Sequence, residues 1–125
     1  MTSTTYFKTN VLNNITYSGK TVKFYYCFPD DFKVLPVGSY RLASRIGSVG
    51  NINNNAKRET VEYYVSIFGK SPKQIEDISK LIEAKAKSEK FIISFCQDIK
   101  EVDDLYYRRE YRFKANYNPL SGNLI

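Results

Sequence analysis

The residue types that most enzymes use for catalysis are scarce in this sequence. Histidine is absent, which removes the commonest general base, the usual partner of serine and cysteine nucleophiles, and the usual zinc ligand. The two cysteines, Cys27 and Cys96, each stand in an apolar run and form no C-x-x-C pair. We therefore expect buried thiols, with a disulfide between neighbouring strands as the alternative. The sequence predicts a non-enzymatic protein with no cofactor and no metal site.

The remaining chemical motifs give little support for catalysis. Two acidic pairs stand in turn-like segments where solvation explains them, Asp30-Asp31 and Asp103-Asp104. Glu62, Asp98 and Glu101 would be the residues of a metal-dependent nuclease, but their spacing is not specific for one. Gly69-Lys70-Ser71 precedes a predicted helix without the upstream glycine of a P-loop, so we interpret it as a chance match.

Basic and aromatic residues are plentiful by contrast. Lys and Arg number 19 against 13 Asp and Glu, giving a formal net charge of +6, and the chain has 11 Tyr and 8 Phe. Because cations neutralise phosphates and rings stack on bases, this mixture favours nucleic acid as the partner, ahead of a membrane surface. The same composition would also serve solubility and β-sheet packing. No apolar run approaches the ~20 residues of a membrane span, so we expect a soluble, cytoplasmic protein.

The elements that must position these residues are mostly strands. The 125 residues fit one domain, with a core over about 5–117 and a flexible tail over 118–125. Alternation of side-chain type predicts five strands, and an additional N-terminal strand over Thr5–Leu12. The five are Thr21–Phe28, Ser39–Ile46, Glu59–Phe68, Lys90–Asp98 and Leu105–Ala115. Since Lys90–Asp98 is apolar on both faces, we expect it to be central or covered on both sides.

One segment has a helical period. Ser71, Pro72 and Gln74 form a capping box, and an apolar stripe follows at Ile75, Ile78, Leu81, Ile82 and Ala86. This helix falls between the third and fourth of the five strands. The order β-β-β-α-β-β is that of the OB-fold, a five-stranded, partly open barrel whose end the helix closes.

If the more apolar side of each strand faces the barrel interior, the outward side is aromatic and cationic. The predicted nucleic-acid-binding residues on it are Lys23, Tyr25, Arg41, Arg45, Tyr64, Phe68, Tyr106, Arg108, Arg112 and Lys114. Two acids, Glu62 and Glu110, interrupt it. Lys57 and Arg58, in the Asn-rich loop from Gly47 to Arg58, are further binding candidates. The alternative is that these side chains only pair across exposed strands, and one register slip would exchange the two faces.

Leu35-Pro36 with Gly38 before a strand, and the run Ala56–Val61 that enters the next, carry a family resemblance. With the Ile67-Phe68 strand end, the helix and two closing strands, the segment from about Leu35 to Tyr117 resembles the small single-stranded DNA-binding proteins of protein-primed tailed phages. The resemblance implies an OB-fold protein that coats displaced strands during replication. That family has tyrosines in and beside the loop that is Gly47–Asn55 here, so no binding residue is transferred from it.

The sequence therefore predicts a protein that binds single-stranded DNA without sequence specificity, in the cytoplasm of an infected cell if viral. RNA remains open as the polymer, because stacking and phosphate contacts serve both. An interaction module that blocks a host factor is an alternative from another functional class. The apolar end Leu124-Ile125 and an exposed first strand would allow a homo-oligomer.

Overall fold

In a computed structural model of the chain, the described residues are 3–27, 35–48, 58–99, 106–118 and 123–124. They form two helices, α1 (Ser3–Asn10) and α2 (Pro72–Ser88), and one 3-10 turn, η1 (Leu12–Asn14). The strands are β1 (Thr16–Tyr17), β2 (Lys20–Thr21), β3 (Lys23–Tyr26), β4 (Val37–Ser48), β5 (Arg58–Gly69), β6 (Ile92–Ile99), β7 (Tyr107–Asn118) and β8 (Asn123–Leu124). No helix among these residues is long and apolar enough to cross a membrane.

The main sheet is open. Its strands follow the order β3-β4-β5-β7-β6, with β8 pairing beside β7, and β1 pairs only with β2 in a separate hairpin. All pairs along this path are antiparallel except β3 with β4. Within the described ranges β3 and β6 stand at opposite edges without pairing. The predicted β-rich class is confirmed, but the predicted barrel is not, because the described sheet does not close on itself.

The predicted N-terminal strand over Thr5–Leu12 is also wrong, because this segment is helical in α1 and η1. Phe7, Val11 and Leu12 are fully buried, while Thr9 between them is exposed. This spacing of four to five residues follows a helical face rather than a strand. The protein therefore has two described helices, where the sequence predicted one.

The prediction for α2 is confirmed. The Ser71 side chain accepts a hydrogen bond from the Gln74 backbone N–H at 3.2 Å, and the Gln74 side chain accepts one from the Lys70 N–H at 2.7 Å. Ser18 and Gly19 join β1 to β2 with positive φ angles of 51° and 78°. Two successive left-handed residues are typical of the tightest hairpin turns.

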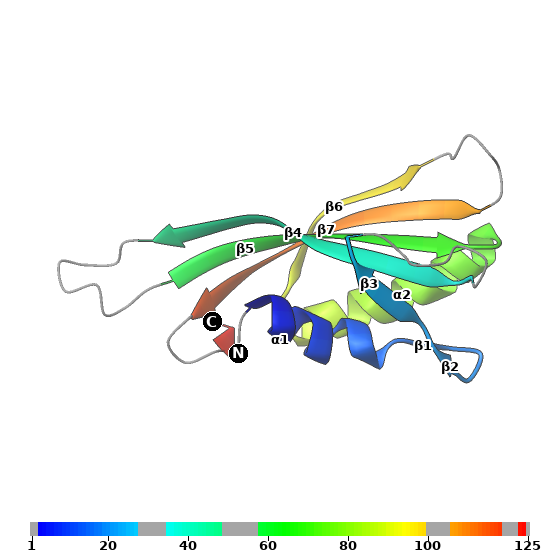
Figure 1. Cartoon of the computed structure of the whole chain (residues 1–125), viewed down its shortest axis with the longest axis horizontal. Coiled ribbons are helices and arrows are strands. Elements are labelled where there is room, and N and C mark those ends of the chain that lie inside the picture. The colour runs from blue at the N-terminus through cyan, green and yellow to red at the C-terminus, as the bar shows by residue number, and fades with distance from the viewer. Residues whose placement is uncertain (1–2, 28–34, 49–57, 100–105, 119–122, 125) are drawn as a thin grey trace.

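Both helices cover the same face of the sheet (Figure 1). Phe7 of α1 stacks on Tyr63 of β5, with ring centroids 4.7 Å apart, and the Tyr63 hydroxyl is hydrogen-bonded to Ser3 at 2.7 Å. Tyr111 of β7 donates a hydrogen bond to Glu83 of α2 at 2.8 Å. Burial raises the pKa of both tyrosines, so the two hydroxyls stay protonated and fix the helices to the sheet.

The predicted central position of Lys90–Asp98 is wrong, because β6 is an edge strand with Ile92 66% and Phe95 38% exposed. Both cysteines are exposed free thiols rather than buried ones. Cys96 lies on this uncovered edge, and Cys27 follows the end of β3. An apolar run alone does not distinguish a covered strand from the edge of a sheet that helices cover on one side only.

Candidate nucleic-acid interface

The sheet face opposite the helices, called the open face below, carries a continuous row of rings and guanidinium groups. The strand register sets Arg41 opposite Tyr64, Tyr64 opposite Arg112, and Arg112 opposite Phe95. These four residues, the stacked row, come from β4, β5, β7 and β6. Directly opposite residues on neighbouring strands point to the same side, so the fold brings together residues that lie far apart in the sequence.

Cations and rings alternate along the stacked row. The Arg41 guanidinium carbon lies 4.2 Å from the Tyr64 ring centroid, and that of Arg112 lies 4.6 Å from the same centroid. Arg112 also lies 5.2 Å from the centroid of Phe95. These distances fall within the range of cation–π attraction. Because β4 and β7 flank β5, Tyr64 has a guanidinium on each side.

The open face carries an excess of positive charge. Its described basic residues outnumber its acidic ones: Lys23, Arg41, Arg108, Arg112 and Lys114 against Glu62 and Glu110. The acids are also poorly placed for strong ion pairs, since Arg112 to Glu62 and Arg108 to Glu110 each measure 3.9 Å. The Nε atom of Arg112 is buried and has no hydrogen-bond partner among the described residues. Rings rather than carboxylates therefore hold this arginine.

A hollow of about 520 Å³ lies beside the stacked row. Its floor is the next register row along the strands, in which Ser39 pairs with Ser66 and Ser66 with Glu110. We call these three residues the floor row. Arg41 and Tyr64 line one side of the hollow. The opposite side is lined by Phe68, Tyr106 and Arg108, with the Phe68 and Tyr106 rings edge to face at 5.3 Å.

Short side chains flanked by long ones produce this shape. Ser39 and Ser66 are only 7% and 6% exposed, so they lie at the bottom. Tyr64 and Phe68 stand two residues before and after Ser66 on the same face of β5, which separates their Cα atoms by ~13 Å. The hollow thus lies above the two serines, between two aromatic and basic walls.

The structure brings nine of the predicted binding residues to the open face. They are Lys23, Tyr25, Arg41, Tyr64, Phe68, Tyr106, Arg108, Arg112 and Lys114. Arg45 does not join them. A register shift between Leu42 and Ser44 pairs Arg45 with the buried Val61, which puts it on the helix side. Lys57 lies outside the described residues, as do the side chain of Arg58 and the centre of the Asn-rich loop.

Sequence reasoning missed Phe95 and the floor row. Strict alternation put Phe95 on the same side as Phe91 and Ile93, but a second register shift between Ile93 and Phe95 moves it to the open face. Ser66 could have been found, because it stands midway between the predicted binding residues Tyr64 and Phe68 on its strand. Ser39, the first residue of its predicted strand, offers no such signal. Bulges also carry no clear signal in a single sequence.

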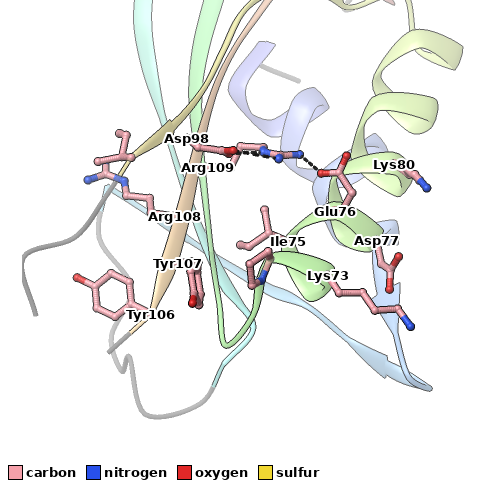
Figure 2. A pocket seen from close by; sticks show the side chains of 12 residues that line it. Lys73, Ile75, Glu76, Asp77, Lys80, Asp98, Tyr106, Tyr107, Arg108 and Arg109 are labelled. Carbon is pink, nitrogen blue, oxygen red and sulfur yellow. Dashed lines mark hydrogen bonds and ion pairs between the residues drawn. The ribbon is translucent and has the colours of Figure 1, made fainter. Parts of the chain in front are cut away.

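A second, larger pocket of about 990 Å³ lies between the start of α2 and the ends of β6 and β7 (Figure 2). Here Arg109 donates to Asp98 at 2.6 Å, contacts Glu76 of α2 at 2.7 Å and donates to Ser79 at 3.1 Å. These bonds hold the pKa of Asp98 below its ordinary value and raise that of Arg109. Tyr106 and Arg108 line both this pocket and the hollow.

The walls of this second pocket combine apolar side chains with charges of both signs. Tyr107, which is 50% exposed, lines it together with Ile75 and Ile99. Lys73 and Lys80 are its exposed cations, and acids of α2 and β6 oppose them. Four cations and three acids line this pocket, so its charges are more nearly balanced than those of the open face.

The acids considered for a nuclease do not come together. Glu62 lies on the open face opposite Lys114, whereas Asp98 lies on the helix side and contacts Arg109. Glu101 lies outside the described residues. In the described part of the chain, no group of three or more Cys, Asp or Glu could hold a metal ion.

Comparison with known protein families and with curated proteins finds no match to this chain.

Proposed function

We propose that the open face binds single-stranded nucleic acid, with DNA as the first candidate, and that it does so without chemistry and without reading an extended sequence. The observation that carries this proposal is the stacked row with the hollow beside it. It supplies, on one surface, the two features that single-strand binders combine, which are cations for phosphates and flat groups for bases.

The order of groups in the stacked row suggests where bases would stack. Both sides of Tyr64 are occupied by guanidinium groups, so a base does not reach its ring without displacing an arginine. The ends of the row are Arg41, which is exposed, and Phe95, which is 38% exposed. We therefore assign base stacking to Arg41 and Phe95, and assign Tyr64 the role of holding the arginines flat.

Held in this way, the arginines are prepared for phosphate. A guanidinium stacked between rings has already lost much of its side-chain freedom, so less entropy is lost when it binds a phosphate. The long distance from Arg112 to Glu62 leaves little competition from the protein's own acids. A duplex would gain the phosphate contacts but not the stacking, because its base faces are covered. Single strands should therefore bind more tightly than duplex.

The biological role that fits this binding is the coating of exposed single strands during replication, as the family resemblance implies. RNA is the alternative polymer, since none of these contacts requires or excludes a 2′-hydroxyl. A second candidate function, an interaction module that blocks another protein, is favoured by the pocket beside α2. That pocket mixes exposed Tyr107 with charges of both signs, which suits a polypeptide better than a phosphate backbone.

The test is fluorescence polarisation of a labelled single strand of about 30 nucleotides at two salt concentrations, with the matching duplex as competitor. The proposal expects binding that weakens with salt, with a slope near −0.7 per phosphate contacted, and that duplex competes for poorly. Absence of binding at low salt would overturn it and favour the blocking module.

A charge-matched control strengthens the test. Arg41→Ala/Arg112→Ala removes two cations from the open face, and Lys20→Ala/Lys87→Ala removes two exposed cations elsewhere, in the β1–β2 hairpin and on α2. Only the first pair should weaken binding strongly. Equal losses in both would point to net charge alone.

A further inference from the structure

We infer that the hollow on the open face is a pocket for a single base and that it prefers a base carrying an exocyclic amino group over thymine or uracil. This inference rests on the proposed function and adds a local preference to it. The observation behind it is the chemistry of the floor row, which differs from that of the walls.

The hollow has the dimensions that a base requires. Its volume of about 520 Å³ lies within the range of small-ligand sites. The ~13 Å along β5 between the Tyr64 and Phe68 Cα atoms leaves room for a flat ring above Ser66. Tyr106 closes the far side, where its ring meets Phe68 edge to face. A base entering here would lie among aromatic walls with its edge toward the floor.

The floor offers an acceptor and a donor side by side. The Glu110 carboxylate reaches the hollow with its side chain 22% exposed, and the Arg108 guanidinium stands 3.9 Å from it. Arg108 also donates to the Ser66 hydroxyl at 3.3 Å, which directs its planar group over the floor. Carboxylates accept from amino groups of bases, and arginine donates to ring nitrogens and carbonyl oxygens.

This pair matches the amino-bearing bases. On the edge used for base pairing, adenine and cytosine each place an amino donor next to an acceptor ring nitrogen. Guanine places two neighbouring donors, N1–H and its amino group, beside the O6 acceptor. Thymine and uracil have one N–H between two carbonyl oxygens on that edge. If Glu110 accepts from this N–H and Arg108 donates to one carbonyl oxygen, the other carbonyl oxygen lies beside the carboxylate and repels it. The preference should therefore be local, affecting the one base in the hollow while the rest of the strand binds without selection.

The test uses a labelled 12-nucleotide oligothymidine in which one central thymidine is replaced by dC, dA or dG. For the unmodified protein we expect each replacement to tighten binding, by about tenfold for the best of the three. In Glu110→Gln the side-chain amide adds a hydrogen-bond donor that thymine oxygen atoms can accept. The ratio of the affinity for a singly replaced oligonucleotide to the affinity for all-thymidine should therefore fall to about one. Binding to all-thymidine should not weaken, because a negative charge has been removed from the face.

Glu62→Gln is a closely matched control. Glu62 lies on the same face, has the same 22% side-chain exposure and stands the same 3.9 Å from an arginine, but it lies outside the hollow. The substitution Glu62→Gln removes the same charge as Glu110→Gln but does not alter the hollow. The ratio of affinities should therefore stay at its value in the unmodified protein.

The possible results separate the two ideas. Equal binding of all four oligonucleotides by the unmodified protein would overturn the base pocket and leave the proposed function intact. An equal fall of the ratio in Glu110→Gln and Glu62→Gln would also overturn the base pocket, because the preference would then depend on the net charge of the open face. Binding of none of the oligonucleotides, nor of a longer strand, would overturn the proposed function together with the inference.

Discussion

Two arginines three residues apart on β7, Arg109 and Arg112, occupy contrasting surroundings. Arg109 points to the helix side, where Asp98, Glu76 and Ser79 surround its guanidinium at 2.6–3.1 Å. Arg112 points to the open face, where it lies between two aromatic rings and its ion pair with Glu62 is 3.9 Å long. The acids around Arg109 neutralise it and join the sheet to α2. The rings around Arg112 orient it and leave its charge available.

The contrast teaches that the number of cations on a surface does not by itself indicate a binding site. Only cations that the protein leaves uncompensated attract an anionic partner strongly, and only those that it holds in place do so at low entropic cost. By this criterion we propose the open face as the binding surface and the Arg109 cluster as a structural joint between the sheet and α2. Four predictions test this division, in order of decreasing effect.

The largest effect is expected from Arg41→Ala/Arg112→Ala. At ~1–3 kcal/mol for each lost stacking or phosphate partner, single-strand affinity should fall about 100-fold or more. The salt slope should become shallower by about 1.4, which corresponds to two phosphate contacts. Titrations at several salt concentrations measure both quantities. An unchanged slope would mean that these arginines contact no phosphate.

Arg109→Met should lower the stability of the fold and leave the affinity for a single strand almost unchanged. Loss of its ion pairs and hydrogen bonds should lower the free energy of unfolding by about 1–2 kcal/mol, a value kept modest because Glu76 and Asp98 are 53% and 69% exposed. Affinity for a single strand should stay within about twofold, since no phosphate contact is removed. Urea denaturation and polarisation titrations on the same preparation measure the two. A large loss of affinity with unchanged stability would move Arg109 into the binding surface.

Phe95→Leu tests the end of the stacked row. Leucine keeps an apolar side chain at this partly exposed edge position but removes the flat ring, so affinity should fall about fivefold through the loss of one stacking site. Stability should change little, because the side chain is exposed. Tyr107→Leu is the control, since it removes a half-exposed ring from the pocket beside α2 rather than from the open face. An equal loss from the control would mean that the strand also contacts that pocket.

The smallest effect concerns pH. Arg109 holds the pKa of Asp98 below its unfolded value, so this interaction stabilises the fold above about pH 4 and is lost as the pH falls through the lower, folded-state pKa. In Asp98→Asn this contribution should disappear, and stability should decline less steeply below about pH 4 than in the unmodified protein. Thermal melts between about pH 2 and 7 measure the difference. Identical acid profiles would show that the pair does not contribute to stability.

Sequence reasoning found the elements of the sheet better than their assembly. Alternation located the strands around Tyr25, Tyr64 and Arg112 and assigned the correct face to each. It failed for Arg45 and Phe95, because one extra residue in a strand reverses every face that follows and leaves no mark on composition. It also read the N-terminal segment as a strand, although Phe7, Val11 and Leu12 fit a helical face equally well.

The sequence was enough to predict which residues share the candidate surface, but not how their side chains contact one another. The sequence indicates that rings and cations share one side of the sheet. Whether Tyr64 is free to stack on a base, or is already covered by Arg41 and Arg112, depends on strand neighbours that only the topology supplies. The order β5-β7-β6 also decides that Tyr64 meets Arg112, since β5 and β7 are neighbours in the sheet but are not consecutive in the chain.

The most direct test of the central claim is to map the bound strand by backbone amide chemical shifts, titrating the labelled protein with a short oligonucleotide. The account predicts shifts centred on the open-face positions 39–41, 64–66, 95 and 108–112, with α1 and the exposed side of α2 unaffected. Shifts centred on the pocket between α2 and Tyr107, with the stacked row unchanged, would contradict it.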